Sequence, residues 1–241
     1  VAENAREQAG GDHETVEFLD CVIEAIDAVL ALAARYASEA RRLGRNDVAD
    51  ILDRVPAGPP AGFHEALQAL RFLHSTVWLS GHYHVGLGRF DQYMIPYLQA
   101  DLAGARLTME DAEELLAEFF ITLNRDSDLY PGVQQGDNGQ SLMLGGVTRD
   151  GQDAVNELTW MVLRVAAEVN MIDPKINLRV SPETDLDLLE LAAQLTKQGL
   201  GFPQYSNDEV VIPGLVKHGY ALEDARDYTV ATCWEYIIPG R

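Results

Sequence analysis

Two residues near the end of the chain, Cys233 and Glu235, have types and a spacing that would let them do chemistry together. They lie in the stretch YTVATCWEYIIPG, after a strand-like run and before Pro239-Gly240. In an extended segment, the side chains of residues i and i+2 project to the same side. A thiol and a carboxylate would then face one substrate, while Trp234 points the opposite way into packing. We expect Pro239-Gly240 to turn the chain back, so that a finger-like loop presents a reactive thiol beside an acid/base group.

The spacing alone favours a second interpretation, in which Cys233 is a small buried hydrophobic residue and Glu235 is a surface charge. Other familiar chemistry is disfavoured. The glycines match no phosphate-binding pattern, and the chain has no G-x-S-x-G elbow. His82 and His84 lie two residues apart with no further ligand at metal spacing nearby, so no metal site is predicted.

Composition excludes some classes of partner. The 241 residues include 38 acidic and 18 basic side chains, for a net charge of −20, which disfavours nucleic acid. No apolar run approaches the ~18 residues that span a bilayer, and no signal peptide is visible. Two cysteines make no disulfide framework, so we expect a cytoplasmic protein without a membrane partner.

Periodicity predicts helices that alternate with short, mostly buried strands, which is typical of an α/β fold. Thr108 and Asp111 form a predicted capping box, and Ser181-Pro182 is predicted to begin a helix that ends at Gly199. We expect residues 1–241 to form one domain or one piece of a larger one. The predicted helices are 14–43, one from Phe63, one after Thr108, about 153–169 and the one after Ser181-Pro182; the predicted strands are 141–147, 175–180 and 227–233.

Five longer motifs favour the interpretation of Cys233 as a reactive thiol over that of a buried hydrophobic residue. They occur in this order: VPAGPPAGFHEALQALRF, GRFDQYMIPYLQADL, QSLMLGGVTRDGQDAVNELT, LGFPQYSNDEVVIPGL and EDARDYTVATCWE. Together they resemble the central catalytic portion of glycyl radical enzymes, the pyruvate formate-lyase family, from about residue 14 to the end.

The resemblance implies part of a ten-stranded α/β barrel, made of two antiparallel half-barrels wrapped in long helices. It implies that Cys233 sits on a loop inside the barrel and becomes a thiyl radical that takes hydrogen from a small organic substrate. Glu235 corresponds to the acid/base residue of the eliminating and dehydrating members. Burial would raise the Glu235 pKa and exclude water and oxygen from the radical.

The same resemblance implies that no cofactor is bound directly. A glycyl radical on another segment would be installed by an S-adenosylmethionine-dependent activating enzyme, which is the expected protein partner, and a homodimer is expected. The chain ends at Arg241 and holds no R-V-x-G-Y-like stretch, so we expect the glycyl radical domain to be absent from it. A longer polypeptide is the first explanation, and a split enzyme completed by another chain is the second.

Three departures bear on the reaction. Thr232 precedes Cys233 where pyruvate formate-lyase has a second cysteine, which disfavours pyruvate cleavage. SGHY (80–83) places Tyr83 where many dehydrating members have a substrate-binding serine, which indicates a differently shaped pocket. TCWE also differs from the commoner GCVE, so the subfamily stays open: dehydratase, eliminase or decarboxylase.

The substrate-binding residues predicted beside Cys233 and Glu235 are His82, Tyr83, Asn138 and Gln140. Each has a plainer alternative, as a loop residue or as a partner of loop backbone. Arg89 and Asp91 are predicted to be structural and available for pairing. Two rival functions remain: a non-catalytic binding or scaffold protein of the same family, and a conventional thiol enzyme that pairs Cys233 with His82 or His84.

Overall fold

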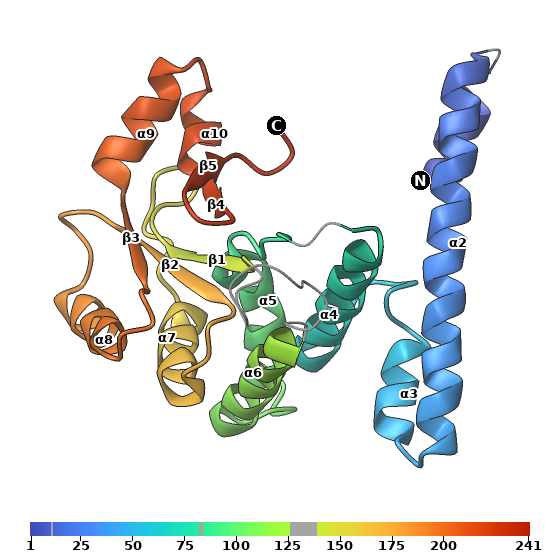
Figure 1. Cartoon of the computed structure of the whole chain (residues 1–241), viewed down its shortest axis with the longest axis horizontal. Helices are drawn as coiled ribbons and strands as arrows, with labels where there is room; N and C mark the ends of the chain where they lie inside the picture. The colour runs from blue at the N-terminus through green and yellow to red at the C-terminus, as the bar shows by residue number, and fades with distance from the viewer. Residues whose placement is uncertain (11, 82–83, 126–138) are drawn as a thin grey trace. The chain divides into compact units, whose positions relative to one another are not determined.

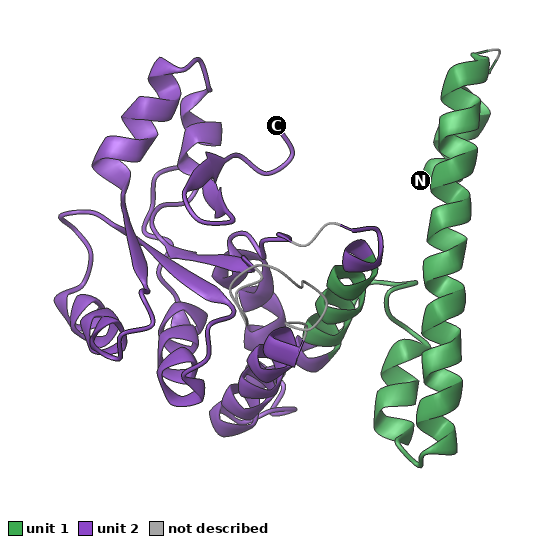
Figure 2. Cartoon of the chain, in the orientation of Figure 1, with its two compact units in different colours: residues 1–61, 65–76 green, residues 62–64, 77–241 purple. Residues whose placement is uncertain are grey.

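The structure, a computed structural model, describes residues 1–10, 12–81, 84–125 and 139–241 (Figure 1). It divides into two compact units, coloured separately in Figure 2. Unit 1 comprises Val1–Ala61 and Glu65–Thr76, and unit 2 comprises Gly62–His64 and Val77–Arg241. Cys233 and Glu235 both belong to unit 2.

Unit 1 is helical. Its elements are α1 (Ala2–Gln8), α2 (His13–Arg42), α3 (Asn46–Leu52) and most of α4 (Phe63–Leu79). The long helix predicted for 14–43 is confirmed by α2, and the helix predicted from Phe63 is confirmed by α4. The short α3 was not predicted, because seven residues carry too little periodicity to stand out. Its apolar side packs on α2 in a core of five buried residues: Ala33, Ala37, Ala49, Leu52 and Phe72.

Several helices of unit 2 begin at side-chain caps. In α6 (Met109–Asn124), Thr108 and Asp111 form the predicted capping box. Asn156 caps α7 (Glu157–Val169), which therefore starts about four residues later than predicted. The prediction of a Ser181-Pro182 cap was wrong, because Asp185 caps α8 (Leu186–Lys197). The remaining helices are α5 (Phe90–Ala103), α9 (Asp208–Lys217) and α10 (Leu222–Arg226).

A parallel three-stranded sheet forms the centre of unit 2, in the order β1 (Ser141–Gly145), β2 (Lys175–Val180) and β3 (Gln204–Asn207). Ser141 pairs with Lys175, and Asn177 pairs with Gln204. Every residue of β1 is buried, as expected for a strand covered on both faces. In Figure 1, α7 and α8, which link the successive strands, lie on one side of the sheet, and the segment from α9 to β5 lies on the other.

The last elements are β4 (Thr229–Ala231) and β5 (Glu235–Ile237), which form a separate antiparallel pair. Side chains of this hairpin join a core of Met143, Tyr228, Val230 and Ile238 over β1. The α/β class is thus confirmed, with parallel strands linked by helices. Within the described residues, no helix is both long and apolar enough to cross a membrane.

Candidate active site

Cys233 lies at the tip of the β4–β5 hairpin. Ala231 pairs with Glu235, which leaves Thr232, Cys233 and Trp234 as the turn. The predicted finger-like loop therefore exists, but it turns three residues after β4 begins rather than at Pro239-Gly240. Because the segment is a tight turn and not an extended strand, the alternation expected for residues i and i+2 does not apply to it.

The Glu235 carboxylate folds back over this turn. Its Oε2 accepts hydrogen bonds from the Thr232 hydroxyl, from the Cys233 backbone N–H at 3.2 Å and from the Trp234 backbone N–H at 3.1 Å. These donors, with the Thr232 hydroxyl first, lower the pKa of Glu235 to about 2. The expectation of a raised pKa was wrong for this structure, because donors to the charged form outweigh burial at an exposed carboxylate.

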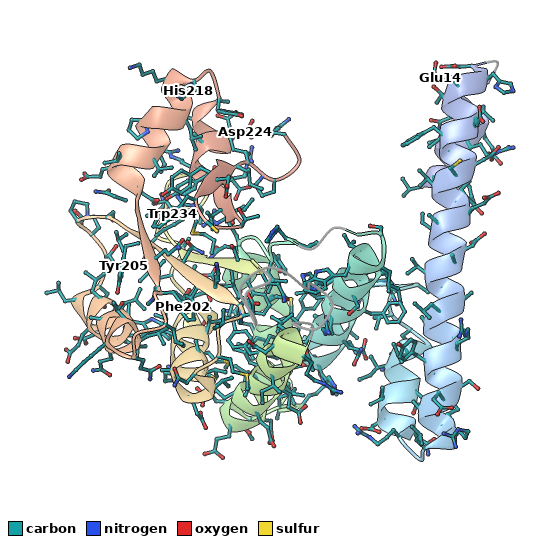
Figure 3. The ribbon with its side chains drawn as sticks, in the orientation of Figure 1. Glu14, Phe202, Tyr205, His218, Asp224 and Trp234 are labelled. Carbon is teal, nitrogen blue, oxygen red and sulfur yellow. The ribbon has the colours of Figure 1, made fainter. Side chains whose placement is uncertain are left out.

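Cys233 and Glu235 are both exposed in this chain, so the chain by itself does not form the dry interior expected around them. Trp234, labelled in Figure 3, has 64% of its surface exposed. The prediction that its side chain packs into the interior is therefore wrong for this chain. The hairpin projects from one face of the sheet, and no other described element of unit 2 packs over its tip closely enough to bury it. The thiol and the carboxylate are close in sequence and share one turn, but they share it in contact with solvent.

Ser141 connects the turn to the sheet through a hydrogen bond. This role was not predicted from the sequence. Its hydroxyl donates a hydrogen bond to the backbone carbonyl of Thr232, and its own carbonyl accepts from the Leu87 N–H at 2.7 Å. Ser141 is fully buried at the start of β1. A hydroxyl at the first position of an otherwise apolar buried strand was the available signal, because such a group needs a partner.

Gln140 is the one predicted substrate-binding residue that the structure describes, and its side chain is directed elsewhere. Its amide Nε2 donates to the carbonyl of Leu123 in α6 at 3.1 Å, and its backbone N–H donates to Asp173 at 3.3 Å. Gln140 stands just before β1 and its side chain contacts α6, whereas the Ser141 side chain contacts the hairpin. His82, Tyr83 and Asn138 lie outside the described residues.

Two buried arginines hold the chain that leads into β4. Arg179 forms a bidentate ion pair with Asp208, both contacts at 2.8 Å, and also donates to the carbonyl of Arg226 at 2.8 Å. Its guanidinium lies 4.1 Å from the ring centre of Tyr228, whose hydroxyl donates to Asp208 at 2.7 Å. Burial is the main reason that the pKa of Tyr228 is raised.

Arg89 forms the second anchor. It pairs with Asp227 at 3.0 Å rather than with Asp91, and it donates to the carbonyls of Gly145 and Val147. Asp91 is fully buried and accepts from the Gly145 N–H and from the Thr159 hydroxyl, while burial raises its pKa. Both residues join β1 to its surroundings, which agrees with the structural interpretation of GRFDQY.

A groove of about 710 Å³ runs beside the hairpin. Its walls come from residues 84–89, from Tyr93 in α5 and from both hairpin strands, with Val230 and Ile237 among the apolar residues. His84 lines the groove, but Cys233 and Glu235 do not. The structure therefore does not bring His84 and Cys233 together in one pocket.

The described residues thus form an α/β fold whose parallel sheet carries a Cys-x-Glu hairpin on one face. The family model described as Pyruvate formate lyase-like matches residues 2–241, and the chain belongs to this family. The resemblance drawn from the five motifs is thus confirmed.

The relatives are large enzymes. Isethionate sulfite-lyase of Nitratidesulfovibrio vulgaris is 32% identical over 93% of this chain and 29% of its own length. Among solved structures, hydroxyproline dehydratase from Clostridioides difficile, with substrate trans-4-hydroxy-L-proline bound, matches with a TM-score of 0.91 at 27% identity over 98% of this chain and 33% of its own. The glycerol-bound B12-independent glycerol dehydratase from Clostridium butyricum matches with a TM-score of 0.90 at 32% identity, over 99% and 33%. The chain thus spans about a third of the length of these relatives.

Proposed function

We propose that this chain is the cysteine-bearing portion of a glycyl radical lyase of the dehydratase, eliminase or decarboxylase type. The observation that carries the proposal is the hairpin turn, in which Cys233 and the Glu235 carboxylate share one backbone hydrogen-bond network at the end of a family match that spans the chain. The sheet would be part of a ten-stranded barrel, and the remaining two thirds of such a protein would cover the exposed turn.

The reaction divides between the two side chains. A glycyl radical outside this chain, installed by an S-adenosylmethionine-dependent activating enzyme, would supply the unpaired electron. The Cys233 S–H bond would break and its hydrogen atom would pass to that glycyl radical, which leaves a sulfur radical that can take a hydrogen atom from a substrate C–H bond. After a neighbouring group has left the substrate radical, the product radical takes the hydrogen atom back from Cys233.

Glu235 would act as the general acid/base that accepts and returns the proton. An ionised carboxylate in the same turn as the thiol can accept a proton from a substrate hydroxyl adjacent to the carbon radical, and can return it to the leaving group. Its low pKa in the exposed turn keeps it ionised, ready to accept. Covering the turn would remove water and raise that pKa, which would make the carboxylate a stronger proton acceptor and let it hold the proton until the leaving group takes it.

The test uses the complete protein after anaerobic activation. Wild type and Cys233→Ala should give equal amounts of glycyl radical by electron paramagnetic resonance, whereas only wild type should turn over a substrate. The substrates to try are those in the names of the relatives: isethionate, (2S)-3-sulfopropanediol, trans-4-hydroxy-L-proline and glycerol.

A second readout needs no substrate. In heavy water the Cys233 thiol carries deuterium, so hydrogen exchange between the sulfur and the radical glycine should replace the glycine α-hydrogen and remove its splitting from the spectrum. Cys233→Ala should keep the splitting. Exchange or turnover that survives this substitution would end the proposal, and failure to install any radical would favour the non-catalytic binding or scaffold alternative.

A further inference from the structure

Thr232 contacts both the sheet and the carboxylate. Its backbone carbonyl accepts the hydrogen bond from buried Ser141 in β1, and its side-chain hydroxyl donates to Glu235 Oε2. A single residue therefore links a rigid strand to the proposed proton-transfer group. The side chain of Thr232 itself is only half-buried, so burial does not explain why a threonine stands here.

The backbone at Thr232 is costly for a threonine. Its φ is +52°, in the left-handed region that β-branched residues rarely adopt. Glycine takes this conformation without strain, but glycine has no hydroxyl to offer. A side chain that is retained at a strained position in a candidate site suggests that the side chain has a task.

That task can be read from the hydrogen bonds around Glu235. Oε2 receives three donors, and two of them are the backbone N–H groups of Cys233 and Trp234. Backbone N–H groups alone would let the flexible glutamate side chain rotate away, since it is exposed. The Thr232 hydroxyl adds the third donor from the opposite end of the turn and so closes the carboxylate onto the backbone of Cys233.

We propose that Thr232 is a positioning residue, whose hydroxyl fixes the Glu235 carboxylate against the Cys233 turn while Ser141 fixes Thr232 to the sheet. The inference rests on the proposed function, in which Glu235 transfers the proton. Thr232 acts through Glu235 and contacts no substrate in this scheme.

Proton transfer gives this role a signature. The Thr232 hydrogen bond is the largest of the causes that lower the pKa of Glu235, and the other lowering causes are backbone N–H groups. Loss of the hydroxyl therefore raises the pKa. If the reaction needs the ionised carboxylate, the acidic limb of the rate profile must move to higher pH.

Three substitutions in the complete, activated protein separate this role from a structural one. Thr232→Ser keeps the hydroxyl, Thr232→Val keeps the branched shape without it, and Thr232→Gly removes the hydroxyl and the strain together. The valine and glycine variants should lose about tenfold or more in kcat, with KM little changed, and their acidic limbs should shift upward. The serine variant should stay within about threefold of wild type with an unshifted limb.

Crystal structures of the valine and serine variants provide a readout that does not depend on activity. The carboxylate should leave the turn in Thr232→Val and stay in Thr232→Ser. The inference is overturned if the carboxylate stays in both, if serine is as impaired as valine, or if the glycine variant has wild-type kinetics. A glycine variant that cannot be activated would assign Thr232 a purely structural role and would overturn it as well.

The two proposals fail differently. If Cys233→Ala still exchanges deuterium into the glycyl radical, the proposed function is lost whatever the Thr232 variants do. If that exchange is abolished as expected and Thr232→Val behaves as wild type, only the role of Thr232 is lost.

Discussion

Replacement of Arg179 by methionine should be among the most destabilising single changes in unit 2. Arg179 has no exposed surface and forms a bidentate pair with Asp208, which is only 4% exposed. Methionine is apolar and of similar length, but it leaves the Asp208 carboxylate buried without its cation. Removal of one partner of a buried ion pair costs about 3–5 kcal/mol.

The size of the expected shift follows from the length of the chain. In domains of about 150–250 residues, 1 kcal/mol moves the melting temperature by about 2–4 °C. Thermal unfolding of Arg179→Met, followed by circular dichroism, should therefore show a melting temperature about 6–20 °C lower than that of the wild type. Because Arg179 also donates to the carbonyl of Arg226, just before β4, the variant should disturb the Cys233 turn as well.

Two controls make the reasoning refutable. Arg164 pairs with Glu113 on the surface, so Arg164→Met should shift the melting temperature by less than about 4 °C. The double variant Arg179→Met with Asp208→Leu removes the orphaned charge and should recover much of the loss. If Arg179→Met unfolds within about 3 °C of wild type, or the double variant is worse than the sum of its single changes, the argument about the buried charge is wrong.

Three further predictions concern single residues of unit 2. Because burial raises the pKa of Asp91, the folded chain binds its proton more tightly than the unfolded chain, so that contribution to stability is present at low pH and is lost as pH rises through the folded pKa. Asp91→Asn should accordingly gain on the wild type in melting temperature as pH rises above about 4, and a constant difference would contradict this. Thr108→Ala removes the capping box of α6 and should cost about 1 kcal/mol in denaturant unfolding; no measurable loss would show that the cap is redundant. Gly146 has φ +75°, and a Cβ there would meet the Nε of Arg179, so Gly146→Ala should cost about 2–4 kcal/mol in the same assay. Gly214→Ala, where nothing lies within 4 Å of an added Cβ, serves as the control and should not destabilise the chain.

Most of the local structure could be predicted from the sequence. The periodicity of 14–43, the Thr108 capping box and the strand candidate KINLRV each correspond to an observed element, because caps and amphipathic patterns are short-range properties. Helix starts were less predictable. At α8 the predicted cap, Ser181, stands four residues before the residue that caps the helix, Asp185.

The order of the strands and the partners of the buried charges depend on long-range contacts. Arg89 was available for pairing, but its partner Asp227 lies 138 residues away and cannot be found by spacing. The same holds for Ser141, which meets Thr232 across 91 residues. Local sequence patterns do not predict which residues far apart in the chain come into contact.

By itself, the sequence determined the chemical identity of the site: one cysteine, a glutamate two residues later, and a threonine rather than a second cysteine before them. It also determined the α/β class through the alternation of its periods. Only the tertiary structure decided the state of the carboxylate, because the pKa depends on which donors the turn directs at Glu235 and on how much water reaches it. For that reason a group expected to be buried and protonated more easily is instead exposed and held ionised by its own turn.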